Sequence, residues 1–233
     1  MVILYNQIVM DMKKLNHLLL FLTLLFSIVS TAQEPDGSIK LFTIYPGYVV
    51  TNAGDTAKGY LMLKNKISNQ GKVFFFKTPD SKDPVKYKPN DIKAYKVANR
   101  FYESMKYSPE YTTMRYCFLL RTTDGPITVY KAYFDDKKRI KIDENDIWNS
   151  KIDFSFSESE LKEQILGCRK GEELQDFGSL EYIMKFKKKM SGYLSDCNEI
   201  AKKIANKEDG YVYGNLEKII AEYNSWYLKN HMN

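Results

Sequence analysis

The stretch that decides the predicted fold is residues 47–63, GYVVTNAGDTAKGYLML. Residues 48–51 and 58–63 are two runs rich in β-branched, aromatic and other apolar side chains, as is typical of strands. Residues 52–55 lie between them and have turn chemistry, because Gly54 can adopt a positive φ and the flanking Asn and Asp side chains can bond to their own backbone. The stretch therefore predicts a β-hairpin that opens a sheet.

About eight strands are predicted in all, and the clearest second hairpin pairs residues 113–122 with residues 127–134. Asp124 and Gly125 form its turn. We expect one face of its first strand to meet the core (Met114, Tyr116, Phe118, Leu120) and the other to be half exposed (Arg115, Cys117, Leu119, Arg121). Further strands are expected at residues 39–44, 72–77, 92–98, 101–107 and 151–156, with a polar turn at 65–71.

The pattern changes at Ser157, which forms a capping-box signature with Glu160. Leu161, Ile165 and Cys168 follow at helical spacing, which predicts a helix that ends near Gly171. Residues 180–194 fit either a helix or a strand. Two more helices are expected, one capped by Ser195 and a last one at residues 216–228.

These patterns predict an α+β fold in a single mature domain, residues 33–233. An antiparallel β-rich body (a meander, roll or partial barrel) would occupy residues 39–156, and C-terminal helices at residues 157–228 would pack on it.

Residues 1–32 have the features of a secretory signal peptide. Lys13 and Lys14 precede an apolar run at residues 18–29, and small residues lead to a cleavage site after Ala32. The run is shorter than the roughly 20 residues that span a bilayer. Residues 1–11 lie upstream of the charged start, so we expect translation to begin at Met12. The predicted location is the periplasm or the cell exterior, with no transmembrane segment after cleavage.

The three cysteines, Cys117, Cys168 and Cys197, leave two alternatives open in such a compartment. One is a Cys168–Cys197 disulfide with an odd thiol, because both residues fall in the predicted helical half. The other is three free, buried cysteines. The net charge of +6 is small for a nucleic-acid-binding protein, so no nucleic-acid partner is expected.

No catalytic, cofactor-binding or metal-binding residue is predicted. The chain has 2 histidines; His17 leaves with the signal peptide and His231 lies at the end, which argues against hydrolases and metal sites that depend on histidine. Ser159 and Lys162 match an S-x-x-K motif without its partner motifs, and we interpret them as the start of a helix. The acidic stretches at residues 135–136 and 143–146 are interpreted as solvated turns.

Two features admit a binding role as well as a structural one. Lys185, Lys187, Lys188 and Lys189 form a basic cluster that is able to contact lipid headgroups or anionic glycans, although such runs are usually the wet face of a helix. Trp148 and Trp226 are able to stack on sugars or to close the core.

Two segments resemble a family of uncharacterised secreted proteins common in the Bacteroidota. Residues 47–61 are similar to the opening of those proteins, and residues 193–223, with Ser195-Asp196-Cys197, are similar to their C-terminal helices. The resemblance implies secretion and a shared fold, and it implies no catalytic residues.

The function expected from these observations is that of a secreted, non-enzymatic protein without a cofactor that binds an envelope protein or a glycan. One alternative is a glycan hydrolase based on two carboxylates, which would show an acidic pair about 5–10 Å apart in a cleft. Another is a structural subunit of an envelope assembly, which would show an open sheet edge and an exposed apolar patch.

Overall fold

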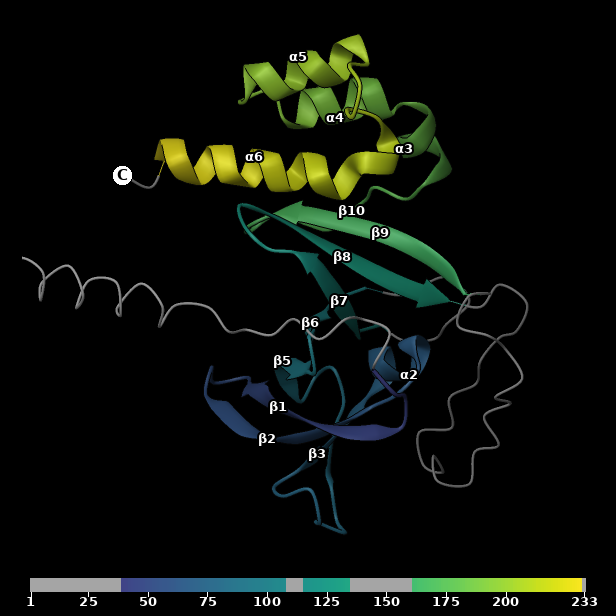
Figure 1. Ribbon diagram of the computed structural model, residues 1–233, viewed down its shortest axis with the longest axis vertical. Helices are drawn as coiled ribbons and strands as arrows, with labels where there is room; N and C mark the ends of the chain where they lie inside the picture. The colour runs from purple at the N-terminus through teal and green to yellow at the C-terminus, as the bar shows by residue number, and fades with distance from the viewer. Residues whose placement is uncertain (1–38, 108–114, 135–160, 232–233) are drawn as a thin grey trace, which may run out of the picture. The chain divides into compact units, whose positions relative to one another are not determined.

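The computed structural model describes residues 39–107, 115–134 and 161–231, all within a compact unit that runs from Ile39 to Asn233. In these residues one antiparallel sheet is followed by C-terminal helices (Figure 1), which confirms the α+β, β-rich fold class. Its strands are β1 Thr43–Thr51, β2 Thr56–Leu63, β3 Val73–Phe76, β4 Val85–Tyr87, β5 Ile92–Val97, β6 Arg100–Met105, β7 Cys117–Thr123, β8 Ile127–Phe134, β9 Lys162–Arg169 and β10 Gln175–Asp176. Its helices are α2 Lys66–Gly71, α3 Leu180–Met184, α4 Phe186–Tyr193, α5 Asn198–Asn206 and α6 Leu216–His231, with a 3₁₀ turn at Tyr213–Asn215.

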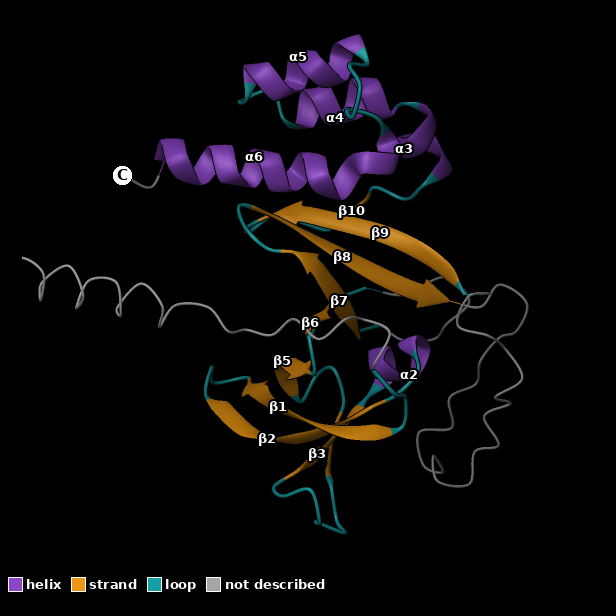
Figure 2. Ribbon diagram, viewed as in Figure 1, coloured by secondary structure: helices purple, strands orange, loops and turns teal. Residues whose placement is uncertain are grey.

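The sheet has the strand order β10-β9-β8-β7-β6-β5-β1-β2-β3-β4, and every neighbouring pair is antiparallel. It consists of two meanders joined by the pairing of β1 with β5, and Figure 2 shows the strands separated from the C-terminal helical layer. The meander is therefore the form of the β-rich body that the described residues take.

The first predicted hairpin is confirmed and is longer than expected. β1 and β2 pair from Thr43 opposite Leu63 to Val50 opposite Thr56, and the turn between them places Gly54 at a φ of 102°. The amide of Thr51 donates to the carbonyl of Asp55 at 2.8 Å. The separate strand expected at residues 39–44 is wrong, because the last two of these residues continue into β1.

The predicted polar turn at residues 65–71 is also wrong, since the structure has the helix α2 there. Asn69 and Gln70 are only 1% exposed, and their amide side chains act as peptide groups. Asn69 bonds to both the amide and the carbonyl of Lys64, and Gln70 bonds in the same way to Tyr133 of β8. Buried polar groups need such partners, so these side chains point inward and tie α2 to the residue after β2 and to β8.

One buried cluster, which draws on strands of both meanders from β1 to β7, lies against α2. Tyr95 and Tyr102 stack with ring centroids 4.7 Å apart, and Phe118 meets Tyr95 edge-on at 4.9 Å. The hydroxyl of Tyr95 donates to the carbonyl of Asn69 at 2.7 Å, so the buried phenol has the partner that burial requires. The remaining buried members of this cluster are Val49, Leu61, Leu63, Val73, Phe75, Ile92 and Val97.

The second predicted hairpin exists as β7 and β8, but both faces of β7 are buried. Phe118 belongs to the cluster of Tyr95 and Tyr102, whereas Cys117 and Leu119 are 0% exposed on the other face, beside Tyr130. The expected half-exposed face is therefore wrong at these two positions. Tyr116 precedes the strand and is 40% exposed, so it lies outside the core.

The helix predicted from Ser157 is wrong where the structure describes it, because residues 162–169 form strand β9. β9 pairs with β8 along its whole length, from Ile127 opposite Arg169 to Phe134 opposite Lys162. A strand alternates its side chains between two faces, and here both faces are covered, which produces an apolar run that imitates helical spacing. The β-rich part thus extends to Asp176, and the C-terminal helices begin at Leu180. Ser157, Glu160 and the strand expected at residues 151–156 lie outside the described residues.

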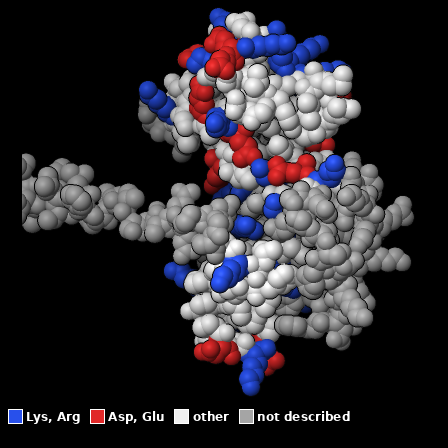
Figure 3. All heavy atoms as spheres, turned by 45° about the vertical axis from the view of Figure 1, so that its right-hand side comes forward, with Lys and Arg blue, Asp and Glu red and all other residues white. Residues whose placement is uncertain are grey.

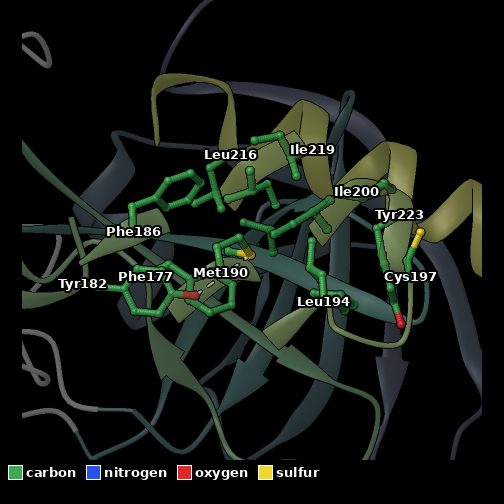
Figure 4. Packing of buried hydrophobic residues seen from close by; sticks show 14 residues of the cluster. Phe177, Tyr182, Phe186, Met190, Leu194, Cys197, Ile200, Leu216, Ile219 and Tyr223 are labelled. Atoms are coloured by element: carbon green, nitrogen blue, oxygen red, sulfur yellow. Dashed lines mark hydrogen bonds between the residues drawn. The ribbon is translucent and has the colours of Figure 1, made fainter. Parts of the chain in front are cut away.

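The C-terminal helices share one core with the facing side of β8 (Figure 4). Residues 180–194, which the sequence left between helix and strand, form α3 and α4. The predicted last helix is confirmed as α6, with its stripe buried. The predicted cap is wrong, since Cys197 rather than Ser195 precedes α5. The buried residues of this core are Ile127, Val129, Phe177, Tyr182, Phe186, Met190, Leu194, Cys197, Ile200, Ile204, Leu216, Ile219, Ile220 and Tyr223.

In the part of the chain that the structure describes, no helix is both long enough and apolar enough to cross a membrane.

Candidate functional site

A cavity of about 760 Å³ opens at the end of the second meander, beside the β7–β8 turn. The sheet contributes Glu103, Met105, Arg121, Thr128, Tyr130 and Cys168 to it. The β7–β8 turn, the end of β9 with the turn that follows it, and the end of α6 contribute Asp124, Gly125, Pro126, Arg169, Lys170, Gly171, Glu172, Tyr227 and Leu228. We call it the turn pocket.

Strand alternation and register explain why distant residues meet in the turn pocket. Arg121 of β7 lies directly opposite Tyr130 of β8, and Thr128 of β8 lies opposite Cys168 of β9. Residues that face each other across a strand pair point to the same side of the sheet. These side chains therefore project from the face that also carries Leu119, away from the helical core.

A charged cluster lies within the pocket. The hydroxyl of Tyr130 donates to Oε2 of Glu103 at 2.7 Å. Arg121 places Nη1 3.6 Å from the same oxygen and Nη2 3.2 Å from Oδ2 of Asp124. Its guanidinium also lies 4.0 Å from the centre of the Phe101 ring. A carboxylate has about four lone-pair sites, which is more than these contacts use. Glu103 and Asp124 therefore keep lone pairs that are available to a ligand.

The pKa values of the Tyr130 hydroxyl and the Cys168 thiol favour binding over nucleophilic chemistry. Burial raises the pKa of Tyr130 well above its usual value, and the hydrogen bond to Glu103 raises it further. Burial also raises the pKa of the Cys168 thiol, and the charge of Glu103 adds to that shift. A protonated thiol is a poor nucleophile, so both groups serve at neutral pH as hydrogen-bonding groups.

Two of the three carboxylates that line the pocket, Glu103 and Asp124, do not have the arrangement of a glycosidase pair. Glu103 and Asp124 contact the two terminal nitrogens of the same arginine, Arg121. In a glycosidase the space between the two carboxylates holds the scissile bond and, in inverting enzymes, a water molecule. Here the guanidinium of Arg121 lies between them, which argues against hydrolysis by this pair.

On the other side of β9, Arg169 ties the sheet to the helices. Its Nη2 lies 3.0 Å from Oδ1 of Asp196 and donates to the carbonyl of Tyr193 at 2.7 Å, and its Nη1 donates to the hydroxyl of Tyr223. That hydroxyl donates to Asp196 at 2.5 Å. These contacts lower the pKa of Asp196 in spite of its partial burial, which acts in the opposite direction. The network fixes α4, α5 and α6 on the sheet, so it positions the helical wall of the turn pocket.

A further group with a shifted pKa, Lys64, directly follows β2. It is 7% exposed, and its Nζ lies 4.0 Å from the centre of the Phe74 ring. Burial lowers the pKa of Lys64 to about 8, and the charge of Lys86 contributes. Strongly perturbed lysines occur at functional sites, but neither described cavity includes Lys64, so we assign it a structural role.

The shifted pKa of Lys64 makes stability depend on pH. The unfolded chain holds this proton up to the ordinary lysine pKa of 10.5, whereas the folded chain releases it near 8, so the folded state binds fewer protons in between. Stability must then rise with pH in that window, by about 2 kcal/mol between about pH 7.5 and 9.5. Urea unfolding of wild type and Lys64→Met at several pH values is expected to show this rise in the wild type relative to the variant. The prediction would be contradicted if the free energy of unfolding changed with pH in the same way in the wild type and in Lys64→Met.

The disulfide considered from the sequence is absent, and all three cysteines are free and buried. Cys168 points to the face of β9 that carries Leu166, whereas Cys197 belongs to the helical core on the opposite face. The sheet therefore separates the two thiols, and the alternative of three free, buried cysteines is the one that the structure shows.

Other sequence candidates are placed as follows. Lys162 begins β9, so the interpretation of the S-x-x-K match as a helix start is wrong at that residue. Trp226 packs against Tyr223, with ring centroids 5.7 Å apart, and so helps to close the core. His231 stacks on Tyr227 at 4.2 Å. Trp148, Ser159 and the acidic residues 135–136 and 143–146 lie outside the described residues.

Sequence reasoning did not single out the turn pocket. The available signal was Arg121, which alternation along the predicted strand at residues 113–122 placed on a face of mixed polarity; Arg115 of the same predicted face precedes β7 and does not line the pocket. The partners Glu103 and Tyr130 come from other strands, and their positions depend on register. Within the described ranges, no cluster of three or more His, Cys, Asp or Glu residues is arranged to hold a metal ion.

Comparison with family models, with curated proteins and with solved structures finds no match for this chain. The resemblance to secreted proteins of the Bacteroidota therefore stays a prediction.

Proposed function

We propose that the protein is a secreted, non-enzymatic binding protein of the periplasm or the cell exterior, and that its turn pocket holds an envelope or extracellular glycan. The observation that carries the proposal is the pocket itself. Its volume of about 760 Å³ falls within the range of roughly 300–1,000 Å³ that is usual for ligand sites. It also combines a few convergent polar groups with apolar surface, as ligand sites do.

The chemistry of the lining favours a ligand rich in hydroxyl groups. Glu103 and Asp124 supply carboxylate oxygens that accept hydrogen bonds, and Arg121 and Lys170 supply donors. Tyr227, at the end of α6, adds aromatic surface of the kind that packs on the apolar face of a sugar, with His231 covering one face of its ring. Charges of both signs lie close together, which fits a neutral or zwitterionic sugar better than a strongly charged ligand.

Thermal unfolding of the chain from residue 33 to residue 233 with oligosaccharides from peptidoglycan and lipopolysaccharide tests the proposal. A bound glycan is expected to stabilise the folded state by about 2.7 kcal/mol at a hundred times its Kd. Glu103→Gln is expected to weaken that glycan's affinity at least about tenfold, because a hydrogen bond to a charged group contributes about 1.5–3 kcal/mol. Glu173→Gln changes an exposed glutamate outside the pocket lining and is the matched control with unchanged affinity.

Three outcomes would overturn parts of the proposal. A screen without any stabilising glycan would contradict the ligand class. Turnover of the bound glycan would favour the carboxylate hydrolase instead. Equal affinities for Glu103→Gln and Glu173→Gln would place the site elsewhere. The secreted state is checked by N-terminal sequencing of the exported protein, which is expected to begin at Gln33.

A further inference from the structure

Helix α3 exposes large apolar side chains that its own core does not use. Leu180 is 73% exposed, Met184 77% and Ile183 38%. Their spacing of three and four residues puts them on one face of the helix. Tyr182 of the same helix points the other way, is 4% exposed and packs against Phe177. The inner side of α3 thus satisfies the core, and the outer side presents three apolar residues to solvent.

Lysines follow this apolar face directly. Lys187 and Lys188 of α4 are exposed, and among the described residues no ion pair involves either of them. Lys185 and Lys189 lie 3.3 Å and 3.1 Å from Oε1 of Glu181, so they share a single carboxylate. Residues 180–189 therefore carry four lysines and one glutamate, a local net charge of +3.

We infer that α3 and the start of α4 form a docking surface for an anionic lipid bilayer, with Leu180, Ile183 and Met184 entering the interface and the lysines contacting headgroups. An interfacial element of this kind combines apolar side chains with a rim of lysines that anionic lipids attract. Figure 3 shows an extended uncharged area on the helical layer with Lys and Arg side chains at its upper border. The inference does not depend on the turn pocket.

Charge and size argue for a bilayer over other occupants. A second copy of the chain would bring its own lysines against these lysines, and like charges in contact oppose association. Three side chains on one short helix also offer much less than the roughly 800 Å² per partner that a stable protein interface buries. A bilayer needs only shallow insertion of a few apolar side chains, together with electrostatic attraction.

Vesicle flotation of the chain from residue 33 to residue 233, which contains the whole compact unit from Ile39, tests the inference. Vesicles of equal parts phosphatidylglycerol and phosphatidylcholine are expected to bind the protein, and vesicles of phosphatidylcholine alone are not. Leu180→Ser with Met184→Ser is expected to reduce binding at least about tenfold. Lys187→Glu with Lys188→Glu is expected to do the same, and added salt is expected to weaken wild-type binding.

Controls separate docking from general effects on folding or charge. Val212→Ser removes an apolar residue of 48% exposure elsewhere, and Lys218→Glu reverses an exposed lysine of α6. Neither is expected to change vesicle binding, and all variants are expected to keep the wild-type Tm within a few degrees. The inference would be overturned if the wild-type protein did not bind anionic vesicles. It would also be overturned if the double variant Leu180→Ser with Met184→Ser bound them as well as the wild type does. Capture of an acidic protein through this surface in place of vesicles would also overturn it.

Discussion

Replacing Gly167 with valine is expected to destabilise the protein by about 3 kcal/mol or more. Gly167 lies in β9 on the side of the helical core, and the ring of Phe177 covers it. A Cβ atom at this position would lie 2.2 Å from Cε2 of Phe177, a separation that real Cβ atoms do not show. Phe177 is 0% exposed and packs against Tyr182 and Tyr193, so the ring has no free space to enter.

The sign of the change in stability caused by Gly167→Val distinguishes core packing from intrinsic strand propensity. Valine favours strands and glycine disfavours them, so strand propensity predicts a stabilisation of up to about 1 kcal/mol. Chemical denaturation of wild type and variant decides between the two. Gly192→Ala in α4 is the matched control, because a Cβ there meets nothing within 4 Å and alanine suits a helix. It is expected to be neutral or stabilising. A stable Gly167→Val protein would show that the ring moves easily.

The energetic coupling between Gly167 and Phe177 gives a second test of the same contact. Phe177→Ala destabilises the core by itself, but it also removes the ring that the valine would meet. The double variant is therefore expected to be less destabilised than the sum of the single variants, by at least about 1 kcal/mol. Strict additivity would place the cost of Gly167→Val elsewhere in the strand.

Asn224→Ala is expected to cost about 3–4 kcal/mol, because it leaves buried peptide groups without partners. Asn224 of α6 is 4% exposed, and its side chain accepts a hydrogen bond from the amide of Ile127 at 2.9 Å. It donates to the carbonyl of the same residue at 2.7 Å and to the carbonyl of Asp124 at 3.3 Å. One amide side chain thus takes the place of a strand partner where β8 begins.

Asn230→Ala on the same helix is the matched control. Asn230 is exposed, and its amide donates to the carbonyl of Trp226 at 2.7 Å, where water is able to replace it. Alanine at this position is expected to change stability by no more than about 0.5 kcal/mol. Equal losses for the two variants in urea unfolding would show that Asn224 contributes only its helical propensity.

The sequence was most informative where one physical effect acts locally. Turn chemistry around Gly54 located the first hairpin, and the stripe of Leu216, Ile219 and Tyr223 located the last helix. It failed where tertiary contacts override local pattern. β9 is covered on both faces, so its apolar residues imitate helical spacing. The inward-facing amides of Asn69 and Gln70 look like a solvated turn until their peptide partners are known.

The turn pocket was beyond sequence reasoning for a related reason. Its cluster of Glu103, Arg121 and Tyr130 is drawn from three strands, and one residue of slip in either pairing would send a member to the opposite face. The exposed side chains of α3 were a similar case, since their apolar character suggests core until the burial of Tyr182 on the opposite side is known.

The strand order has a consequence for how the chain folds. In the described sheet, β1 and β5 are the only neighbours that are not consecutive along the chain. All other pairings join strands that are consecutive along the chain, so each meander is able to grow one strand at a time, and the longest of these connections is residues 135–161 between β8 and β9. The β1–β5 pairing brings Gly47 beside Val97 and Thr51 beside Ile92. Residues 52–91 separate β1 from β5, a longer stretch than any other strand pairing closes, so this pairing has the largest closure entropy and we expect the two meanders to join late in folding.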